Sequence, residues 1–510
     1  MKRTLLIITV IAAAVMELID ISIVNVALSQ MGGNLGASLE DTSWVITSYA
    51  IANVIIIPIT SFLTAKLGRR NYYIGSIIVF TSFSVMCGMA TNIWALVAFR
   101  FFQGIGGGAL LSVSQAVVFE NFPKEKQNIG SALFGIGVFV GPTIGPTLGG
   151  FITENYSWPW IFFINLPIGI IVAVFCFLLL DEPKIKPKVP SIDWLGIFLL
   201  SAGIGSLQTV LERGETEDWF ETHYIVYLTI TVVVALTLFV LWELRVKEPV
   251  VDLRVLKSKS LAVAAVLTFV TGFGLFTSVF LTPVFAQRIL DYPPFQTGLL
   301  LLPGALLAIF ALMFSAVLLR RGVPANVVIV AGFLSFILFT WKMSRLNLDA
   351  APSDFMLPLI FRGMGLALLT VPLTTLAVSS LDPKDVPQGA ALNNMMRQLG
   401  GSFGIAFLNT YISNRLAVHR NDLISNITLT NYLATEKLKA LANLFAHKGY
   451  TDAQLHGIKL IDLIITKQSY LLSYMNAYLM VGLVFLAALP LLLLVINRKG
   501  GTNVVVISDH

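Results

Sequence analysis

Five ionisable residues stand inside long apolar segments of the 510-residue chain, where a charged side chain is rare. They are Glu17 and Asp20 in one segment, and Arg100, Arg362 and Arg397 in three others. A carboxyl group in a low-dielectric site holds a proton more readily, and a nearby arginine opposes this. A carboxylate that meets and leaves an arginine can therefore load and release a proton. These residues predict proton binding within a membrane.

Depth along the helices places two of these charges together. The first apolar segment starts near Leu5, so at about 1.5 Å per residue Asp20 lies roughly 22 Å along it. Arg100 lies about 9 Å below the opposite face, in a segment that runs the other way from about Trp94. We therefore expect Asp20 and Arg100 to pair, with Glu17 one turn nearer the midplane. The pair predicts proton coupling; the alternative is a fixed ion pair that ties two helices together.

The second half of the chain contributes arginines and amides rather than acids. Arg397 lies about 14 Å from the face at which its segment starts, close to Asn393. With Arg362, and with Asn25 and Gln103 from the first half, these residues are the candidates for the substrate pathway. Arg397 either touches a substrate or bonds to backbone carbonyls between helices, and both interpretations stay open.

The elements that carry these residues are membrane spans. Hydrophobic residues make up 56% of the chain and charged residues only 12%, which excludes a soluble and a disordered protein. Because about 20 apolar residues cross a bilayer as one helix, we expect an all-α integral membrane protein with fourteen transmembrane helices. The spans cover residues 5–28, 44–65, 72–91, 94–118, 129–152, 160–180, 192–211, 223–242, 260–286, 297–319, 325–341, 356–380, 388–411 and 473–496.

Basic residues predict the orientation of these spans. If the N-terminus is inside, the inner segments (2–3, 66–70, 124–126, 184–188, 245–259, 320–321, 384 and 498–499) hold twenty lysines and arginines, and the short outer loops hold four. Both termini are therefore expected in the cytoplasm. The net charge of +6 reflects this asymmetry. The sequence has no basic stripe interleaved with aromatic residues, so we do not expect nucleic-acid binding. Cys87 and Cys176 lie in apolar runs, and no metal site or cofactor is expected.

Landmarks in the first half recur in the second half in the same order. The basic turn at 67–70 is echoed at 319–322, Arg100 by Arg362, and the glycines from Gly141 by those from Gly400, at offsets of about 251, 262 and 259 residues. Parallel six-helix halves commonly surround one substrate path. The predicted domains are therefore an N-terminal six-helix bundle, an inserted helix pair and a C-terminal six-helix bundle, covering residues 1–185, 186–255 and 256–510.

The fifth span combines glycines at four-residue spacing with two prolines. Such glycines allow close helix contact, and the prolines bend the helix. A kinked, tightly packed helix at the boundary between the halves suits a seal that slides. The residues of this stretch are Gly137, Gly141, Pro142, Gly145, Pro146, Gly149 and Gly150.

Residues 413–472 are expected to form a long outer loop. Leu438, Leu441, Leu444 and Phe445 would lie on one face of an amphipathic helix within it. Such a loop is either a cap that seats an adaptor protein or a solvated hairpin that packs on itself. No Walker motif, HExxH or nucleophile elbow is present, which argues against an ATP-driven pump or a membrane hydrolase. We expect a transporter and not an enzyme.

Several segments resemble the fourteen-helix drug:proton antiporters of the major facilitator superfamily. The stretch at 17–28 is similar to their first-span signature, 100–104 to the span-4 motif and 137–150 to the antiporter motif. Residues 160–169, 362–374 and 397–402 resemble the EmrB/QacA branch of this family. Within that branch, residues 205–220 and 242–244 resemble the EmrB type. The resemblance covers nearly the whole chain.

The resemblance implies proton-driven export of varied hydrophobic compounds across the inner membrane by alternating access, with a periplasmic adaptor and an outer-membrane channel as partners. Ser61 and Ala65 stand where the superfamily usually has a glycine and an aspartate, so the gating role of that aspartate does not carry over. Arg69 and Arg70 are still expected to lock onto a neighbouring helix as a cytoplasmic gate. The alternatives are a dedicated exporter of one endogenous metabolite, such as a siderophore or a fatty acid, an uncoupled facilitator, and an importer.

Overall fold

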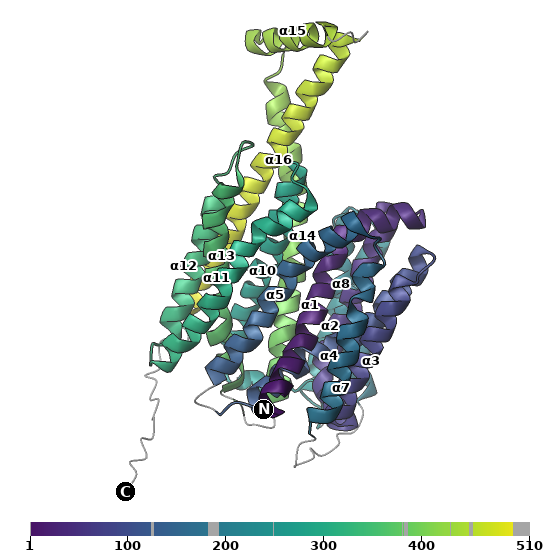
Figure 1. Cartoon of the computed structure of the whole chain (residues 1–510), viewed down its shortest axis with the longest axis vertical. Coiled ribbons are helices and arrows are strands. Elements are labelled where there is room, and N and C mark those ends of the chain that lie inside the picture. The colour runs from purple at the N-terminus through teal and green to yellow at the C-terminus, as the bar shows by residue number, and fades with distance from the viewer. Residues whose placement is uncertain are drawn as a thin grey trace.

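The computed structural model describes residues 2–123, 127–181, 193–247, 249–379, 381, 386–428, 430–447 and 452–492, and these contain helices and no strand (Figure 1). The first seven helices are α1 (Lys2–Leu35), α2 (Leu39–Leu67), α3 (Arg69–Gly88), α4 (Ile93–Glu120), α5 (Gln127–Asn155), α6 (Trp160–Phe163) and α7 (Asn165–Leu179). Next come α8 (Trp194–Arg213), α9 (His223–Glu243), α10 (Lys259–Arg288), α11 (Pro294–Arg320) and α12 (Ala325–Met343). The last are α13 (Pro352–Ser379), α14 (Val386–Ser425), α15 (Tyr432–His447) and α16 (Ala453–Ala488), and short 3₁₀ turns lie at η2 (Trp219–Glu221), η3 (Leu253–Lys257) and η4 (Leu489–Leu492).

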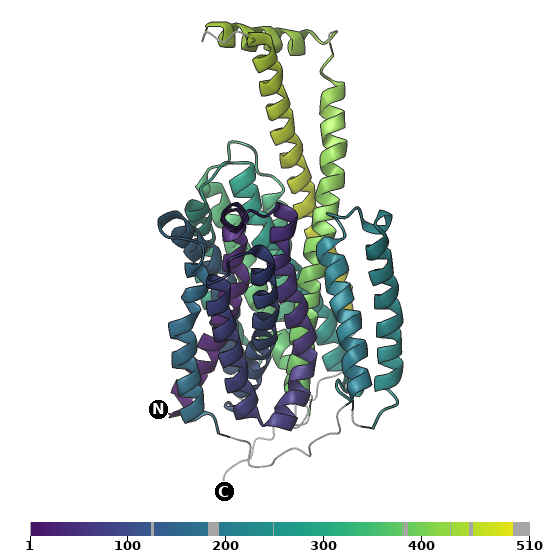
Figure 2. The same cartoon turned by 90° about the vertical axis from the view of Figure 1, so that its right-hand side faces the viewer.

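Thirteen described helical segments, with α6 and α7 joined as one, are long and apolar enough to cross a membrane. The predicted span at 388–411 corresponds to α14, which is not among them because polar residues such as Asn393, Asn394 and Arg397 lower its hydropathy. These three side chains are buried, so α14 is a polar helix in sequence but an interior one in the fold. It runs through the body of the molecule beside α10 and α16 (Figures 1 and 2), and with it the count reaches fourteen.

The helices form two bundles with a helix pair beside them (Figure 2). The first bundle contains α1–α7, the second contains α10–α14 and α16, and the boundary is formed chiefly by α5 against α11 and by α2 and α4 against α14. α8 packs against α2 and α14, whereas α9 packs against α8 and leaves apolar side chains such as Tyr227 and Val233 exposed. The basic residues at 124–126, 184–188, 384 and 498–499 lie outside the described residues.

In each bundle a glycine-rich helix packs against the first helix of that bundle. Gly145 of α5 lies against Ser22 of α1, and Gly400 of α14 lies against the backbone of Phe269 in α10. A Cβ atom at either glycine would collide with these neighbours, so only glycine allows the helices to approach this closely. The two glycine stretches that recur in the sequence therefore occupy corresponding places in the two bundles.

Residues 413–472, expected as an outer loop with amphipathic helices in it, largely continue the neighbouring helices. α14 continues to Ser425 and α16 begins at Ala453, so most of the segment is helical. Both helices project beyond the bundles, and α15 lies across their tips (Figures 1 and 2). No glycine or proline occurs between residues 405 and 448, so nothing breaks α14 where its apolar part ends. The described residues within 413–472 are called the hairpin below.

The predicted amphipathic helix within this segment is confirmed as α15. Leu438 packs against Gly457 of α16, and the rings of Phe445 and His456 lie 5.6 Å apart. Leu444, however, is 49% exposed, so the packed face is narrower than the sequence predicts. The hairpin thus packs on itself and also presents apolar side chains to the outside.

Candidate functional site

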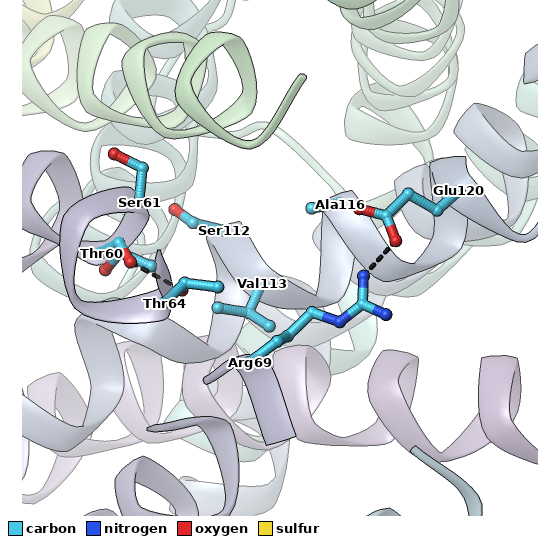
Figure 3. Close-up of a pocket in the computed structure, with 8 residues that line it drawn as sticks. All are labelled: Thr60, Ser61, Thr64, Arg69, Ser112, Val113, Ala116 and Glu120. Carbon is cyan, nitrogen blue, oxygen red and sulfur yellow. Dashed lines mark hydrogen bonds and ion pairs between the residues drawn. The ribbon is translucent and has the colours of Figure 1, made fainter. Parts of the chain in front are cut away.

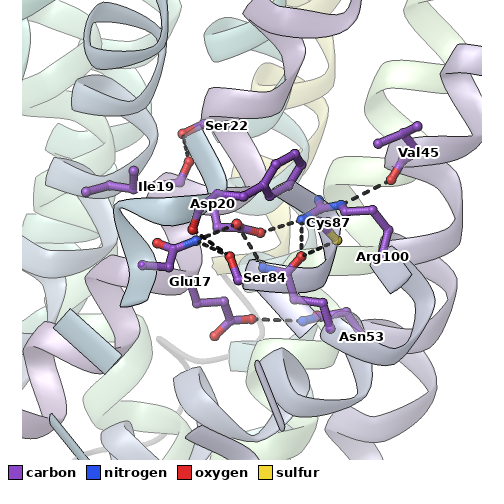
Figure 4. A network of polar contacts seen from close by, with 12 residues as sticks. Glu17, Ile19, Asp20, Ser22, Val45, Asn53, Ser84, Cys87 and Arg100 are labelled. Atoms are coloured by element: carbon purple, nitrogen blue, oxygen red, sulfur yellow. Dashed lines mark hydrogen bonds and ion pairs between the residues drawn. The ribbon is translucent and has the colours of Figure 1, made fainter. Parts of the chain in front are cut away.

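The predicted contact between Asp20 and Arg100 is confirmed. Arg100 of α4 donates to Asp20 Oδ2 of α1 at 2.6 Å, and the two side chains are 1% and 0% exposed (Figure 4). The helices meet because α1 and α4 pack in one bundle, and the two residues lie at matching depth because the helices run in opposite directions. Burial of both charges makes each dependent on the other, since either one alone would lack a counterion.

Two amide side chains complete the surroundings of Asp20. Asp20 Oδ1 accepts hydrogen bonds from Gln103 of α4 at 3.0 Å and from Asn165 of α7 at 2.8 Å. Gln103 also accepts from Arg100 at 2.9 Å, so this residue, predicted for the substrate pathway, lies within the ion-pair network. Asn165 was missed as a site residue. Its one signal in the sequence is that it is an amide near the start of an otherwise apolar span. Asn165 also donates a hydrogen bond to the hydroxyl of Ser84 in α3 at 3.0 Å.

Glu17 lies one turn away and has no counterion among the described residues. Asn53 of α2 donates to Glu17 Oε1 at 2.8 Å, while Oε2 is buried without a hydrogen-bond partner there. The ring of Tyr49 in α2 lies 4.2 Å from the Arg100 guanidinium, and its hydroxyl is unpartnered within the described chain. Asn53 and Tyr49 were also missed. The two carboxyl groups therefore differ: Asp20 is neutralised by a cation, and Glu17 is not.

The predicted substrate-pathway residues of the second bundle are buried but do not join one hydrogen-bonded cluster. Arg362 of α13 is 3% exposed and donates to the Ser278 carbonyl of α10 at 3.5 Å. Asn393 of α14 accepts from Thr268 of α10 at 2.8 Å. Arg397 is 7% exposed, and its Nη1 finds no partner in the described part of the chain. The fifth candidate, Asn25 of α1, is exposed rather than buried.

The glycines of the antiporter motif form a stripe that faces α1. Gly137 lies against Val15, and Gly141, Gly145 and Gly149 follow at one-turn intervals against later residues of α1. Pro142 and Pro146 stand inside the same helix, and Gly150 is buried beside the stripe.

α5 does border the second bundle, as expected, but through a different face. There Thr147 meets Gly298 of α11, and Ser131 shares a hydrogen bond of 3.0 Å with Thr375 of α13. The stripe itself joins α5 to the helix that carries Glu17 and Asp20.

The expected contacts of Arg69 and Arg70 with neighbouring helices are present. Arg69 forms an ion pair with Glu120 at the end of α4, beside a small cavity of about 20 Å³ lined by Thr60, Thr64 and others (Figure 3). Arg70 donates to the Phe177 carbonyl of α7. These contacts join helices of the first bundle to one another.

Two carboxylates of the inserted pair were missed because the predicted spans ended one residue too early. Glu212 of α8 accepts from Gln208 at 2.9 Å, and Gln208 also reaches Ser402 of α14 at 3.0 Å. Glu243, at the end of α9, is 1% exposed. An acid directly after an apolar run is the signal that could have found both.

The fold agrees with comparisons to known proteins. The chain matches the model of the Major Facilitator Superfamily over residues 10–405. It is 33% identical to the fatty acid resistance protein FarB of Neisseria gonorrhoeae over 481 residues, which cover 94% of this chain and 93% of that protein. It is also 33% identical to the multidrug export protein EmrB of Escherichia coli K12 over 486 residues, covering 94% and 92% of the two chains.

Among solved structures, the human organic anion transporter MFSD10 has the same fold. Its TM-score is 0.61, with 96% of this chain and 99% of that chain covered, at 13% sequence identity. Together with the family match over most of the sequence, these similarities establish that the chain is a multi-pass membrane transporter that belongs to the Major Facilitator Superfamily and, within it, to the EmrB type.

Proposed function

We propose that this chain is a proton-coupled antiporter that exports hydrophobic compounds across the inner membrane by alternating access. The observation that carries the proposal is the pair of buried acids on α1. Asp20 forms an ion pair with Arg100, whereas Glu17 has no counterion within the described chain. Similarity to proteins named for multidrug export and fatty acid resistance supports lipophilic compounds as the substrates.

The proton step follows from competition for Asp20. In the contact between them, Arg100 balances the charge of Asp20. In the proposed cycle a movement of α1 against α4 separates the two side chains, a proton takes the place of the arginine on the carboxylate, and the return of Arg100 displaces the proton. Glu17 lies one turn away from Asp20 on α1 and takes part as a second proton acceptor.

The driving force is sufficient for export against a gradient. One proton that moves down about 100 mV supplies roughly 2.3 kcal/mol, and each pH unit adds about 1.4 kcal/mol. Together these amount to about 3.7 kcal/mol, which supports a roughly 500-fold gradient of an uncharged solute at one proton per molecule.

Alternating access would open the boundary between the two bundles from either side. Polar contacts across that boundary include Asn394 to Gln115 at 2.7 Å and Ser131 to Thr375 at 3.0 Å. Each such hydrogen bond contributes only about 0.5–1.5 kcal/mol to stability, so the free energy needed to break them when the bundles rock is small. Arg69 and Arg70 join α3 to α4 and α7 at the proposed cytoplasmic gate.

The basic residues of the inner segments support a cytoplasmic location for both termini, and this orientation would direct the hairpin into the periplasm. There it would seat a periplasmic adaptor that leads to an outer-membrane channel. Exposed apolar side chains on α15, such as Leu433 (74%) and Tyr432 (72%), support this role. Replacing residues 426–452 by a short Gly/Ser link removes α15 and leaves α14 and α16 intact. The partner role is refuted if co-purification with the adaptor and efflux from cells both persist.

The test of antiport uses proteoliposomes that contain a trapped pH dye and the wild-type chain, Asp20→Asn or Asp462→Asn. Asp462 is a matched control because it is an exposed acid of the hairpin, paired with Arg420 at 2.7 Å. Tetraphenylphosphonium and octanoate serve as a lipophilic cation and a weak acid. We expect solute-triggered proton flux in the wild type and in Asp462→Asn, and its loss in Asp20→Asn. Equal proton flux in all three proteins would refute the assignment of proton coupling to Asp20.

The second candidate is a dedicated exporter of one endogenous metabolite such as a fatty acid. It is favoured by the two buried arginines of the second bundle and by the similarity to FarB. Flux with one compound of the panel and with no other would select it over the multidrug interpretation.

A further inference from the structure

Two buried arginines of the second bundle have no carboxylate to balance them among the described residues. Arg362 and Arg397 are 3% and 7% exposed. Between residues 259 and 379 the only acids are Asp291, Asp349 and Asp354, which lie at or beyond helix ends, and there is none between residues 386 and 421. The other two buried arginines of the described chain differ in this respect, since each pairs with an acid in its own vicinity.

Polar neighbours do not make up for the missing counterion. The described contacts of Arg362 are a single long hydrogen bond to the Ser278 carbonyl at 3.5 Å, with Nε left unpartnered. Arg397 Nη1 is buried without any partner among the described residues. Asn393 stands four residues earlier on the same helix face, and its Nδ2 is likewise unpartnered there. This face of α14 therefore presents Arg397 Nη1 and Asn393 Nδ2 without a hydrogen-bond acceptor in the described part of the chain.

The sign of the charge decides what such a site binds. Glu17 also lacks a counterion within the described residues, but a carboxyl group can lose its charge by binding a proton. A guanidinium cannot lose its proton in this way, so its charge stays. Burying an uncompensated charge costs several kcal/mol, and an anion that binds beside it removes this cost.

The position of Arg397 suits a transported solute. Asn394, on the neighbouring position to Asn393, donates to Gln115 of α4 at 2.7 Å, so this part of α14 borders the first bundle. Gly272 of α10 touches the Arg397 backbone, and Ser278, the partner of Arg362, follows six residues later on α10. At about 1.5 Å per residue, the two arginines are thus offset by roughly 9 Å along the second bundle.

We propose that Arg397 and Asn393 bind the acidic head group of an amphiphilic organic anion at the boundary between the bundles, and that Arg362 supplies a second positive charge along the same path. The inference rests on the proposed export function and specifies its substrate class: amphiphilic compounds with a carboxylate or similar anionic group, rather than lipophilic cations. An anionic membrane lipid carries the same head-group chemistry, and the experiment separates the two sources.

Binding is measured with the full-length protein in phosphatidylcholine nanodiscs, with empty nanodiscs as the background. The probes are octanoate and octyltrimethylammonium, which share a chain length and differ in charge. The variants are Arg397→Gln, Arg397→Lys and the matched control Arg415→Gln, an exposed arginine of the same helix that lies over Tyr411. We expect Arg397→Gln to weaken octanoate binding roughly 10- to 100-fold, the lysine variant to retain part of it, and the control to bind normally. Octyltrimethylammonium should bind more weakly than octanoate and should not respond to Arg397→Gln.

Asn393→Asp provides a second test that does not depend on the folding of Arg397→Gln. It places a carboxylate one turn from Arg397, so we expect a higher unfolding midpoint together with loss of octanoate binding. Octanoate affinity within twofold of wild type in both Arg397→Gln and Asn393→Asp would overturn the proposal. Tighter binding of the ammonium probe would do the same.

Two further arms separate the possible failures. Octanoate should still bind to Asp20→Asn, because the anion site does not include the proton site; the binding result therefore stands even if proton coupling is disproved. In nanodiscs with added phosphatidylglycerol, octanoate affinity should be unchanged. Displacement of octanoate by the lipid, without any octanoate transport in liposomes, would show a lipid site and refute the substrate assignment.

Discussion

Breaking the Asp20–Arg100 pair should destabilise the protein strongly and in a way that depends on which partner is removed. The two side chains meet at 2.6 Å and are 0% and 1% exposed, so solvent does not screen either charge. Removing one member of such a buried pair costs about 3–5 kcal/mol. In Asp20→Asn the guanidinium still has the Gln103 and Val45 oxygens, and in Arg100→Gln the carboxylate still has the Gln103 and Asn165 amides.

The double variant removes both charges and should be less destabilised than the sum of the two single variants, by about 1–3 kcal/mol. The two single variants leave opposite charges behind: Arg100→Gln leaves a buried carboxylate, and Asp20→Asn leaves a buried guanidinium.

Reversible unfolding in mixed micelles of dodecyl sulfate and a mild detergent, followed by circular dichroism, measures these free energies. The exposed pair of Arg420 and Asp462, with side chains 48% and 55% exposed, is the control, and its single variants should lose no more than about 1 kcal/mol. The reasoning is refuted if both single variants at the buried pair lose no more than the control variants. An additive double variant would also refute it, since the two charges would then not interact.

Three further perturbations test other parts of the structure. Gly145→Leu should abolish the close contact of α5 with α1 and lower both the unfolding midpoint and the transport rate. The control Gly75→Leu, at a helical glycine with open space around it, should leave the midpoint and the rate unchanged. Equal effects of the two variants would contradict the close packing of α5 on α1. Arg69→Glu should impair expression and transport, and adding Glu120→Arg should restore both, which assays of the double variant can check. If the double variant is not rescued, the ion pair between Arg69 and Glu120 does not stabilise the fold. Cys87 is fully buried and should resist maleimide until the protein unfolds, so rapid labelling in the folded state would contradict its position.

Much of the site was predictable because depth in a membrane follows from counting residues. A helix rises about 1.5 Å per residue between two fixed faces, so the sequence places Asp20 and Arg100 at one level without any knowledge of their neighbours. The same arithmetic locates Glu17 one turn away. The recurrence of Gly141 and Gly400 likewise predicts two helices in corresponding positions, and both pack against the first helix of their bundle.

Lateral neighbours are a different matter, because the direction in which a side chain points depends on how fourteen helices pack around one another. Asn165, Asn53 and Tyr49 come from α7 and α2, and nothing in their own segments connects them with the acids of α1. The same limit explains why the glycine stripe of α5 was expected at the boundary of the two halves, whereas it faces α1.

Helix ends were the other failure, and the reason is physical as well. Hydropathy marks where a chain leaves the apolar phase, but a helix stops only where its backbone or its packing makes it stop, and α14 continues to Ser425 in the absence of glycine or proline. The sequence by itself determined the class of protein, the number of spans and the level of each buried charge, since these depend on the bilayer. Only the tertiary structure decided which charges are balanced, with Asp20 held by Arg100 and Arg397 left without a counterion in the described chain, because balance depends on contacts between helices.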